Sequence, residues 1–140
     1  MLVRNIYDEM SRYAYRVGQK VSNDEDAGVS CFLMTVDGVT YEVTQKVRSF
    51  HGTYRLSFLF PQRMPLDLVE LNAVDINKIN GKLDIGCFRV VAHNGLVRYC
   101  VDTILNDCRV DQAYFQALFD RAVATLKKYA PQVTALNDTF

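Results

Sequence analysis

Cysteine and histidine are the residues of this chain whose side chains could supply a nucleophile and the base that activates it. Two of the four cysteines, Cys87 and Cys100, lie on either side of His93 within residues 80–102. A thiol becomes a strong nucleophile when a base such as histidine lies within hydrogen-bonding distance of its sulfur. A Cys-His site using Cys87 or Cys31 is therefore the first chemistry to consider.

The turn in this stretch argues against that chemistry, because it predicts a simple β-hairpin. Asn94-Gly95 between two strand-like runs is a strong signal for a two-residue turn. The predicted strands are 83–92 and 96–104. Pairing across a two-residue turn makes Phe88 face Val101 and leaves Cys87 diagonal to Cys100.

The register of this predicted hairpin separates the reactive groups. Diagonal neighbours lie about 7–8 Å apart at Cα, which is too far for an unstrained disulfide between Cys87 and Cys100. His93 lies at the turn, six residues along the strand from Cys87. His51 would reach Cys87 only if the fold brought the two regions together. We therefore expect no catalytic residues, and we expect all four cysteines to be free thiols.

The glycines of the same stretch do not form a phosphate-binding loop. Gly81 and Gly86 have the spacing G-x-x-x-x-G, but a phosphate loop continues with Lys and then Ser or Thr, whereas Cys87 and Phe88 follow here. The predicted context, a helix followed by a strand, is also reversed. We interpret Gly81 as part of a helix cap and Gly86 as a strand glycine, and we expect no cofactor.

The elements that would position these residues follow from hydrophobic periodicity and turn signals. Helices are predicted at 2–17, 66–79 and 111–130, and strands at 29–36, 39–48, 53–60, 83–92 and 96–104. The order α-β-β-β-α-β-β-α indicates one α+β domain, 1–140, with a mostly antiparallel sheet and helices on one face. Residues 19–28 are interpreted as a polar linker. Pro131 is expected to end the last helix and leave a loose tail, about 132–140.

Two local signals predict more detail. Asp37-Gly38 is a strong two-residue turn, and it makes Val36 face Val39 in the first hairpin. Asp111 precedes the last helix and is expected to cap its N-terminus.

The composition is that of an ordinary globular protein. Of the 140 residues 23% are charged, and the formal net charge is zero. Proteins dedicated to nucleic acids or membrane surfaces are usually basic, so we expect neither as the partner. No apolar run near the N-terminus is long enough for a signal peptide or a membrane span, so we expect a cytoplasmic protein. The cysteines lack zinc-type spacing, and we expect no metal site.

One stretch departs from this neutral balance. The basic residues of this strip, between 46 and 63, are Lys46, Arg48, Arg55 and Arg63. Phe50, His51 and Tyr54 lie among them, and basic residues interleaved with aromatic ones bind single-stranded nucleic acid or phosphorylated partners. The reading we favour is an exposed strand face with protective edge charges.

The run NGKLDIGCF carries a family resemblance. It matches the pattern N-x-x-L-x-x-G-x-F through Asn80, Leu83, Gly86 and Phe88. With the helix before it and the strand HNGLVRYCV after it, the chain resembles the YbjN-like family over about residues 54–130. That family is described as bacterial sensory transduction regulators, and its fold is similar to that of type III secretion chaperones. The resemblance implies no catalytic site, and it makes these four residues determinants of the fold.

A partner surface is expected where apolar residues exceed what the core needs. The predicted core stripe of the second helix is Leu66, Val69, Ala73 and Ile76. The candidate partner or dimer surface comprises Leu68, Leu71, Leu33 and Val91, which lie off that stripe or on the far face of the sheet. In secretion chaperones of this fold the corresponding helix contributes to a homodimer, so the resemblance implies a homodimer here. The alternative is that the extra leucines pack within a broad monomer core.

These observations favour one function over two others. We expect a non-enzymatic, protein-binding adaptor, chaperone-like or regulatory, whose protein partner the sequence does not identify. The alternatives are a small enzyme with a Cys-His site and a nucleic-acid binder that uses the basic strip. A deep polar pocket would favour the enzyme, and shallow apolar grooves would favour the adaptor.

Overall fold

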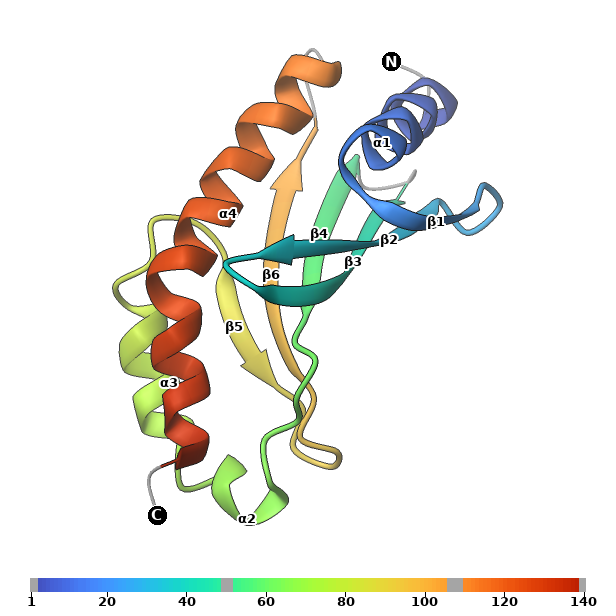
Figure 1. The fold of residues 1–140 in the computed structure, drawn as a ribbon. Helices are drawn as coiled ribbons and strands as arrows, with labels where there is room; N and C mark the ends of the chain where they lie inside the picture. The colour runs from blue at the N-terminus through green and yellow to red at the C-terminus, as the bar shows by residue number, and fades with distance from the viewer. Residues whose placement is uncertain (1–2, 49–51, 106–109, 139–140) are drawn as a thin grey trace.

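The computed structural model describes residues 3–48, 52–105 and 110–138 of the chain (Figure 1). Its helices are α1 Val3–Val17, α2 Leu66–Val69, α3 Ala73–Asn80 and α4 Gln112–Ala135, followed by the short 3-10 helix Leu136–Asp138. Its strands are β1 Gln19–Asp24, β2 Val29–Val36, β3 Val39–Arg48, β4 Thr53–Leu59, β5 Cys87–Val90 and β6 Val97–Ile104. The fold is therefore α+β, as predicted.

The strands form a single antiparallel sheet with helices on one face. The strand order is β1-β2-β3-β4-β6-β5, and every neighbouring pair is antiparallel. Helices α1 and α4 pack on the sheet, and α3 lies beside α4 near β5 (Figure 1). Their packing buries the aromatic core on that face, where the rings of Tyr13 and Phe119 are 4.7 Å apart. The other face carries no helix in the described chain.

The first predicted hairpin is confirmed in register and in turn. Val36 pairs with Val39 across the turn. Asp37 has φ = 50° and Gly38 has φ = 78°, so both turn residues take the positive φ that a two-residue hairpin turn requires. Side chains of β2 and β3 consequently alternate between the core and the open face.

The polar linker predicted at 19–28 contains an edge strand instead. β1 pairs antiparallel with β2, and a bulge lies between Gln19 and Ser22, where Lys20 has φ = 52°. An edge strand with both faces largely exposed needs no alternation of apolar residues, so its composition resembles that of a loop. The predicted element order therefore lacked one strand.

The second predicted hairpin has a different register. Val90 pairs with Val97 and Phe88 pairs with Tyr99, so residues 91–96 form a loop rather than a two-residue turn. The amide of Gly95 donates to the carbonyl of Val91 (2.8 Å), which closes the loop. Cys87 consequently lies directly opposite Cys100, and the predicted diagonal arrangement of the two cysteines is wrong.

The helix predicted at 66–79 is divided into α2 and α3. Asn72 lies between the two helices, is 4% exposed, and donates through Nδ2 to the carbonyl of Leu136 (3.1 Å). The residues that this segment buries are Leu68, Asn72, Ile76 and Ile79. The predicted stripe is shifted accordingly, because Leu66 and Ala73 are exposed. Leu68, predicted as part of a partner surface, belongs to the core.

Helix α4 begins where predicted and extends past the predicted end. Asp111 accepts a hydrogen bond from the amide of Tyr114 (3.0 Å) and caps the helix. The helix runs through Pro131 to Ala135, so the loose tail predicted from about residue 132 is wrong over the described residues. Val133 is 1% exposed, and the free energy gained by its burial offsets the loss of the backbone hydrogen bond that a proline inside a helix removes.

Candidate interaction surface

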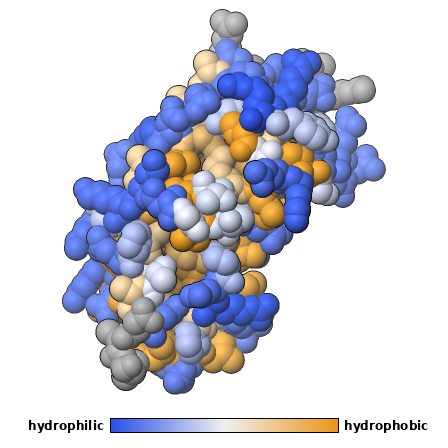
Figure 2. All heavy atoms as spheres, viewed as in Figure 1, coloured by the Kyte–Doolittle hydropathy of each residue, from blue (hydrophilic) through white to orange (hydrophobic). Residues whose placement is uncertain are grey.

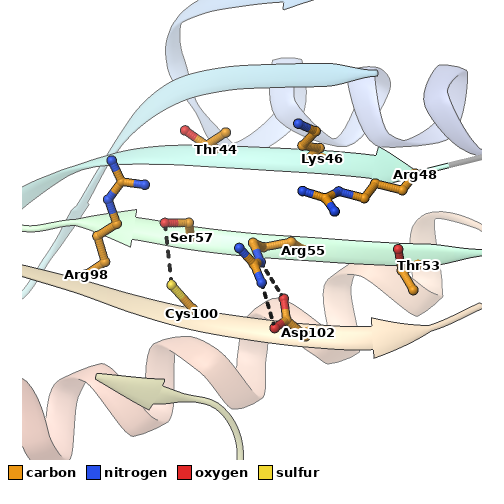
Figure 3. A pocket seen from close by; sticks show the side chains of 9 residues that line it. All are labelled: Thr44, Lys46, Arg48, Thr53, Arg55, Ser57, Arg98, Cys100 and Asp102. Atoms are coloured by element: carbon orange, nitrogen blue, oxygen red, sulfur yellow. Dashed lines mark hydrogen bonds and ion pairs between the residues drawn. The ribbon is translucent and has the colours of Figure 1, made fainter. Parts of the chain in front are cut away.

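The open face of the sheet is hollowed over its central strands. The hollow has a volume of about 550 Å³ (Figure 3). We call it the basic hollow; its lining residues are Thr44, Lys46, Arg48, Thr53, Arg55, Ser57, Arg98, Cys100 and Asp102. They come from β3, β4 and β6, because alternate residues of each strand point away from the helices.

Positive charge dominates this hollow. Asp102 is its acidic residue, and it accepts hydrogen bonds from Nε and Nη2 of Arg55 at 2.7 and 3.1 Å. Arg89, on the neighbouring strand β5, lies 4.0 Å from the same carboxylate. The hydrogen bond with Asp102 raises the pKa of Arg55 above its ordinary value. Asp102 is therefore shared between two arginines.

The structure brings together most of the predicted basic strip and adds to it. Lys46, Arg48 and Arg55 line the hollow, as their spacing on two paired strands requires. Arg63 lies beyond β4 in the segment before α2, is exposed, and does not line the hollow. Arg98 was missing from the predicted strip because it is distant in sequence and reaches the hollow only through the pairing of β4 with β6.

The described thiols contact groups other than histidine. Cys31 Sγ is 3.6 Å from Thr44 Oγ1, and Cys87 Sγ accepts a hydrogen bond from Arg89 Nε at 3.4 Å. His93 lies in the exposed loop between β5 and β6, next to Asn94. The other histidine considered, His51, and the fourth cysteine, Cys108, which was predicted to be a free thiol, lie outside the described residues.

Cys100 is the most protected of the described thiols. It is 6% exposed, and burial raises the pKa of its thiol above the ordinary value, although a hydrogen bond to Ser57 opposes that shift. A raised pKa keeps the sulfur protonated at neutral pH, and the protonated form is a poor nucleophile.

Alkylation of the thiols should therefore proceed in two stages. We expect Cys100 to react with iodoacetamide at least about tenfold more slowly than Cys31 or Cys87 in the native protein. All four cysteines should react after denaturation of the freshly purified chain. Peptide mapping by mass spectrometry measures both stages. Cys87 and Cys100 are direct cross-strand neighbours, so the search for a disulfide concentrates on this pair. A peptide pair linked through them would contradict the expectation of four free thiols.

The four residues of the N-x-x-L-x-x-G-x-F pattern surround the start of β5. Asn80 is the last residue of α3, and Gly81 occupies the cap position that the sequence predicted for it. The side chain of Asn80 instead donates to the carbonyl of Phe88 (2.9 Å) and accepts from its amide (2.7 Å). Phe88 is buried, and Leu83 packs against the core. Asn80 therefore occupies the outer edge of β5, where another strand would otherwise pair.

Apolar hollows lie on the helix side of the molecule. Figure 2 shows apolar side chains gathered over the middle of this side, between α4 and α1, with polar side chains around them. One hollow of about 320 Å³ lies between the β2–β3 turn and α4, and another of about 330 Å³ lies between α1, β2 and α4. Their walls include Val39, Leu126 and Pro131 in the first and Val17, Met34 and Val123 in the second.

The remaining residues of the predicted partner surface do not form one patch. Leu33 is half-buried on β2, near one edge of the sheet. Val91 is half-buried just after β5, the strand at the opposite edge. Leu71 is 59% exposed between α2 and α3.

In the described part of the chain no helix is long and apolar enough to span a membrane, and no group of three or more potential metal ligands was found.

Comparison with known proteins supports the fold and gives no family. No family model and no curated protein matches the sequence. Among solved structures, the chain is similar to a chain of the HopA1-SchA chaperone–effector complex, with a TM-score of 0.52 and 14% sequence identity. The match covers 91% of this chain and 93% of the other. The match supports the predicted α+β fold, which this chain shares with a chain of a chaperone–effector complex.

Proposed function

We propose that this protein is a non-enzymatic, chaperone-like adaptor that binds a segment of another protein. The observation that carries the proposal is the open sheet face, which is hollowed and has no helix over it in the described chain. The apolar hollows beside α4 add shallow grooves of the kind that hold side chains of a partner segment. The fold likeness to a chain of a chaperone–effector complex is consistent with this role.

Affinity capture with a matched variant tests the proposal. The tagged wild-type protein and a variant carrying Leu33→Glu and Thr44→Glu on the open face are incubated with the native cell lysate, and retained proteins are identified by mass spectrometry. We expect the wild-type protein to retain one partner protein in an amount nearly equal to its own. We expect the variant to retain none of that partner. A partner set that is the same for both proteins, or small-molecule turnover with no protein retained, would contradict the proposal.

We propose a homodimer that uses the exposed side of α2 and α3. Leu66, Leu71 and Val74 are each about 60% exposed there, which is high for three apolar residues within nine positions. Leu68 takes no part, because it is buried. An isologous contact would cover these side chains in both copies at once.

Sedimentation equilibrium of the wild type and of Leu71→Glu tests the dimer. We expect the wild type to sediment as a dimer at micromolar concentrations and Leu71→Glu as a monomer, because the introduced carboxylate would be buried without a partner. Ser22→Glu adds the same charge at an exposed position of β1, at the opposite edge of the sheet from α3, and should remain dimeric. A wild type that stays monomeric under these conditions removes the dimer.

Three further proposals concern the family, the compartment and the absence of enzyme activity. Membership of the YbjN-like family, and with it a regulatory role in signalling, is supported by the positions of Asn80 and Gly86 at the start of β5. The cytoplasm is the compartment we propose, since Cys31, Cys87 and Cys100 are free thiols and a reducing compartment maintains them. The absence of enzyme activity is proposed because the groups that contact the sulfurs of Cys31 and Cys87 are the Thr44 hydroxyl and the Arg89 guanidinium, and neither acts as a general base at neutral pH.

A further inference from the structure

The open sheet face at and beside the basic hollow carries an arrangement of charges that opposes folding. Lys46 on β3 lies directly opposite Arg55 on β4, and Arg89 on β5 lies directly opposite Arg98 on β6. Like charges in directly opposed cross-strand positions repel and destabilise a sheet. Two such pairs on one face indicate that the positive charge serves a purpose other than stability.

The single carboxylate in the hollow does not balance these charges. Asp102 is engaged by Arg55 at 2.7 Å and lies 4.0 Å from Arg89. Within the described residues, Lys46, Arg48 and Arg98 have no acidic side chain within ion-pair distance. Figure 3 shows these three side chains over the hollow, with Arg98 extending from β6 across β4. An anion above the sheet would contact them and relieve the repulsion.

The surroundings of the charges favour a peptide over a nucleic acid. Single-stranded nucleic acids bind where aromatic rings stack with bases beside a basic groove. The aromatic residues of the described strands β4 and β6, which are Tyr54, Phe58 and Tyr99, are all buried on the helix side. The hollow instead offers the hydroxyls of Thr44, Thr53 and Ser57, which suit the carbonyl and carboxylate oxygens of a peptide.

The spacing of the charges sets the form of that peptide. Lys46 and Arg48 lie on β3. Arg98 lies two strands away on β6 and four residues along the strands from Lys46, because Arg98 pairs with Leu59 and Leu59 pairs with Glu42. At about 4.8 Å per strand and 3.3 Å per residue, Lys46 and Arg98 are about 16 Å apart at Cα along an oblique line. An extended chain of about five residues spans this distance, with alternate side chains about 6.7 Å apart on one face, so acidic residues near its two ends would each meet a cation.

We propose that the basic hollow binds an extended acidic segment of a protein partner, with Asp or Glu at alternate positions, lying obliquely over strands β3, β4 and β6. Lys46, Arg48 and Arg98 bind its carboxylates, and the hydroxyls between them bind its backbone. This inference rests on the proposed adaptor function and adds the chemical class of the segment that is bound.

Fluorescence anisotropy tests the inference with three labelled probes. They are a peptide of about eight residues with Glu and Thr alternating, the same peptide with Lys for Glu, and an oligothymidylate of similar length. We expect the wild type to bind the glutamate peptide in preference to the other two probes, and added salt to weaken that binding. Lys46→Glu and Arg98→Glu should each weaken binding by about tenfold or more.

Arg63→Glu provides the matched control, because it makes the same change in net charge outside the hollow. It should change the affinity by less than about twofold. A second readout separates binding from damage to the fold: Lys46→Glu should melt no lower than the wild type, because it replaces a repulsive cross-strand pair with an attractive one. Arg98→Gln should weaken binding in the same direction as Arg98→Glu.

Three results would overturn the inference. They are equal losses of affinity in Arg63→Glu and Lys46→Glu, tighter binding of the oligothymidylate than of the glutamate peptide, and no binding of the glutamate peptide at about 1 mM. The proposed adaptor function would survive any of them if the lysate partner were still retained by the wild type. It would fail separately if no protein were retained.

Discussion

Gly86→Ala is expected to destabilise the protein by about 3 kcal/mol, which corresponds to a fall of about 10 °C in the melting temperature. Gly86 has φ = +75°, a conformation that side chains with a Cβ rarely adopt. A Cβ added there would lie 2.6 Å from the carbonyl oxygen of Cys100 and 2.8 Å from the hydroxyl oxygen of Tyr99. The first contact is with backbone of the paired strand β6, which cannot move without disturbing the sheet.

Gly38→Ala is the matched control for this prediction. Gly38 has φ = +78°, but a Cβ added there would meet nothing within 4 Å. The control therefore carries the backbone strain alone, which costs about 1–2 kcal/mol. Urea unfolding of both variants measures the difference. Equal losses of stability would show that the contacts with Cys100 and Tyr99 do not matter, and an unchanged Gly86→Ala would show that the start of β5 is wrongly placed.

Asn80→Ala is expected to lower the free energy of unfolding by about 2 kcal/mol. The Asn80 side chain donates to the backbone carbonyl of Phe88 (2.9 Å) and accepts from its backbone amide (2.7 Å), and its removal leaves one donor and one acceptor without that partner. It also frees the edge of β5 for pairing with another chain. We therefore expect increased self-association of the variant in addition to its lower stability.

Asn77→Ala is the control, because Asn77 is exposed on the same helix. Its effect on stability should stay within about 0.5 kcal/mol. Urea unfolding measures the stability, and light scattering at increasing protein concentration measures the association. If Asn80→Ala matched Asn77→Ala in both measurements, the side chain would not be protecting the edge of β5.

Local signals predicted the parts of the fold that local chemistry determines. Asp37-Gly38 fixed the first hairpin because both residues accept positive φ, and Asp111 marked the start of α4 because its carboxylate satisfies a free amide there. Asn94-Gly95 has the same turn signal, but the two-residue turn predicted from it was wrong. Gly95 also accepts a hydrogen bond from the amide of Met64 (2.8 Å), and that tertiary contact belongs to a longer loop.

Burial depends on partners that are distant in sequence, and this limited the remaining predictions. Leu68 looked like a surface residue on a continuous helix, but the break at Asn72 turns it toward the core. The basic hollow was predicted in part, since Lys46, Arg48 and Arg55 lie on consecutive strands. Arg98 joins them because β6 pairs with β4, and neither strand's own pattern reveals that pairing.

Site-specific photo-cross-linking tests the central claim, that the open sheet face holds a protein partner. A photoreactive phenylalanine is placed at Thr44, which lines the basic hollow, and separately at Ala117, which is exposed on α4. After irradiation in the native cell, we predict one predominant protein adduct from the Thr44 position and no such adduct from Ala117. No adduct from Thr44, or the same adducts from both positions, would contradict the account.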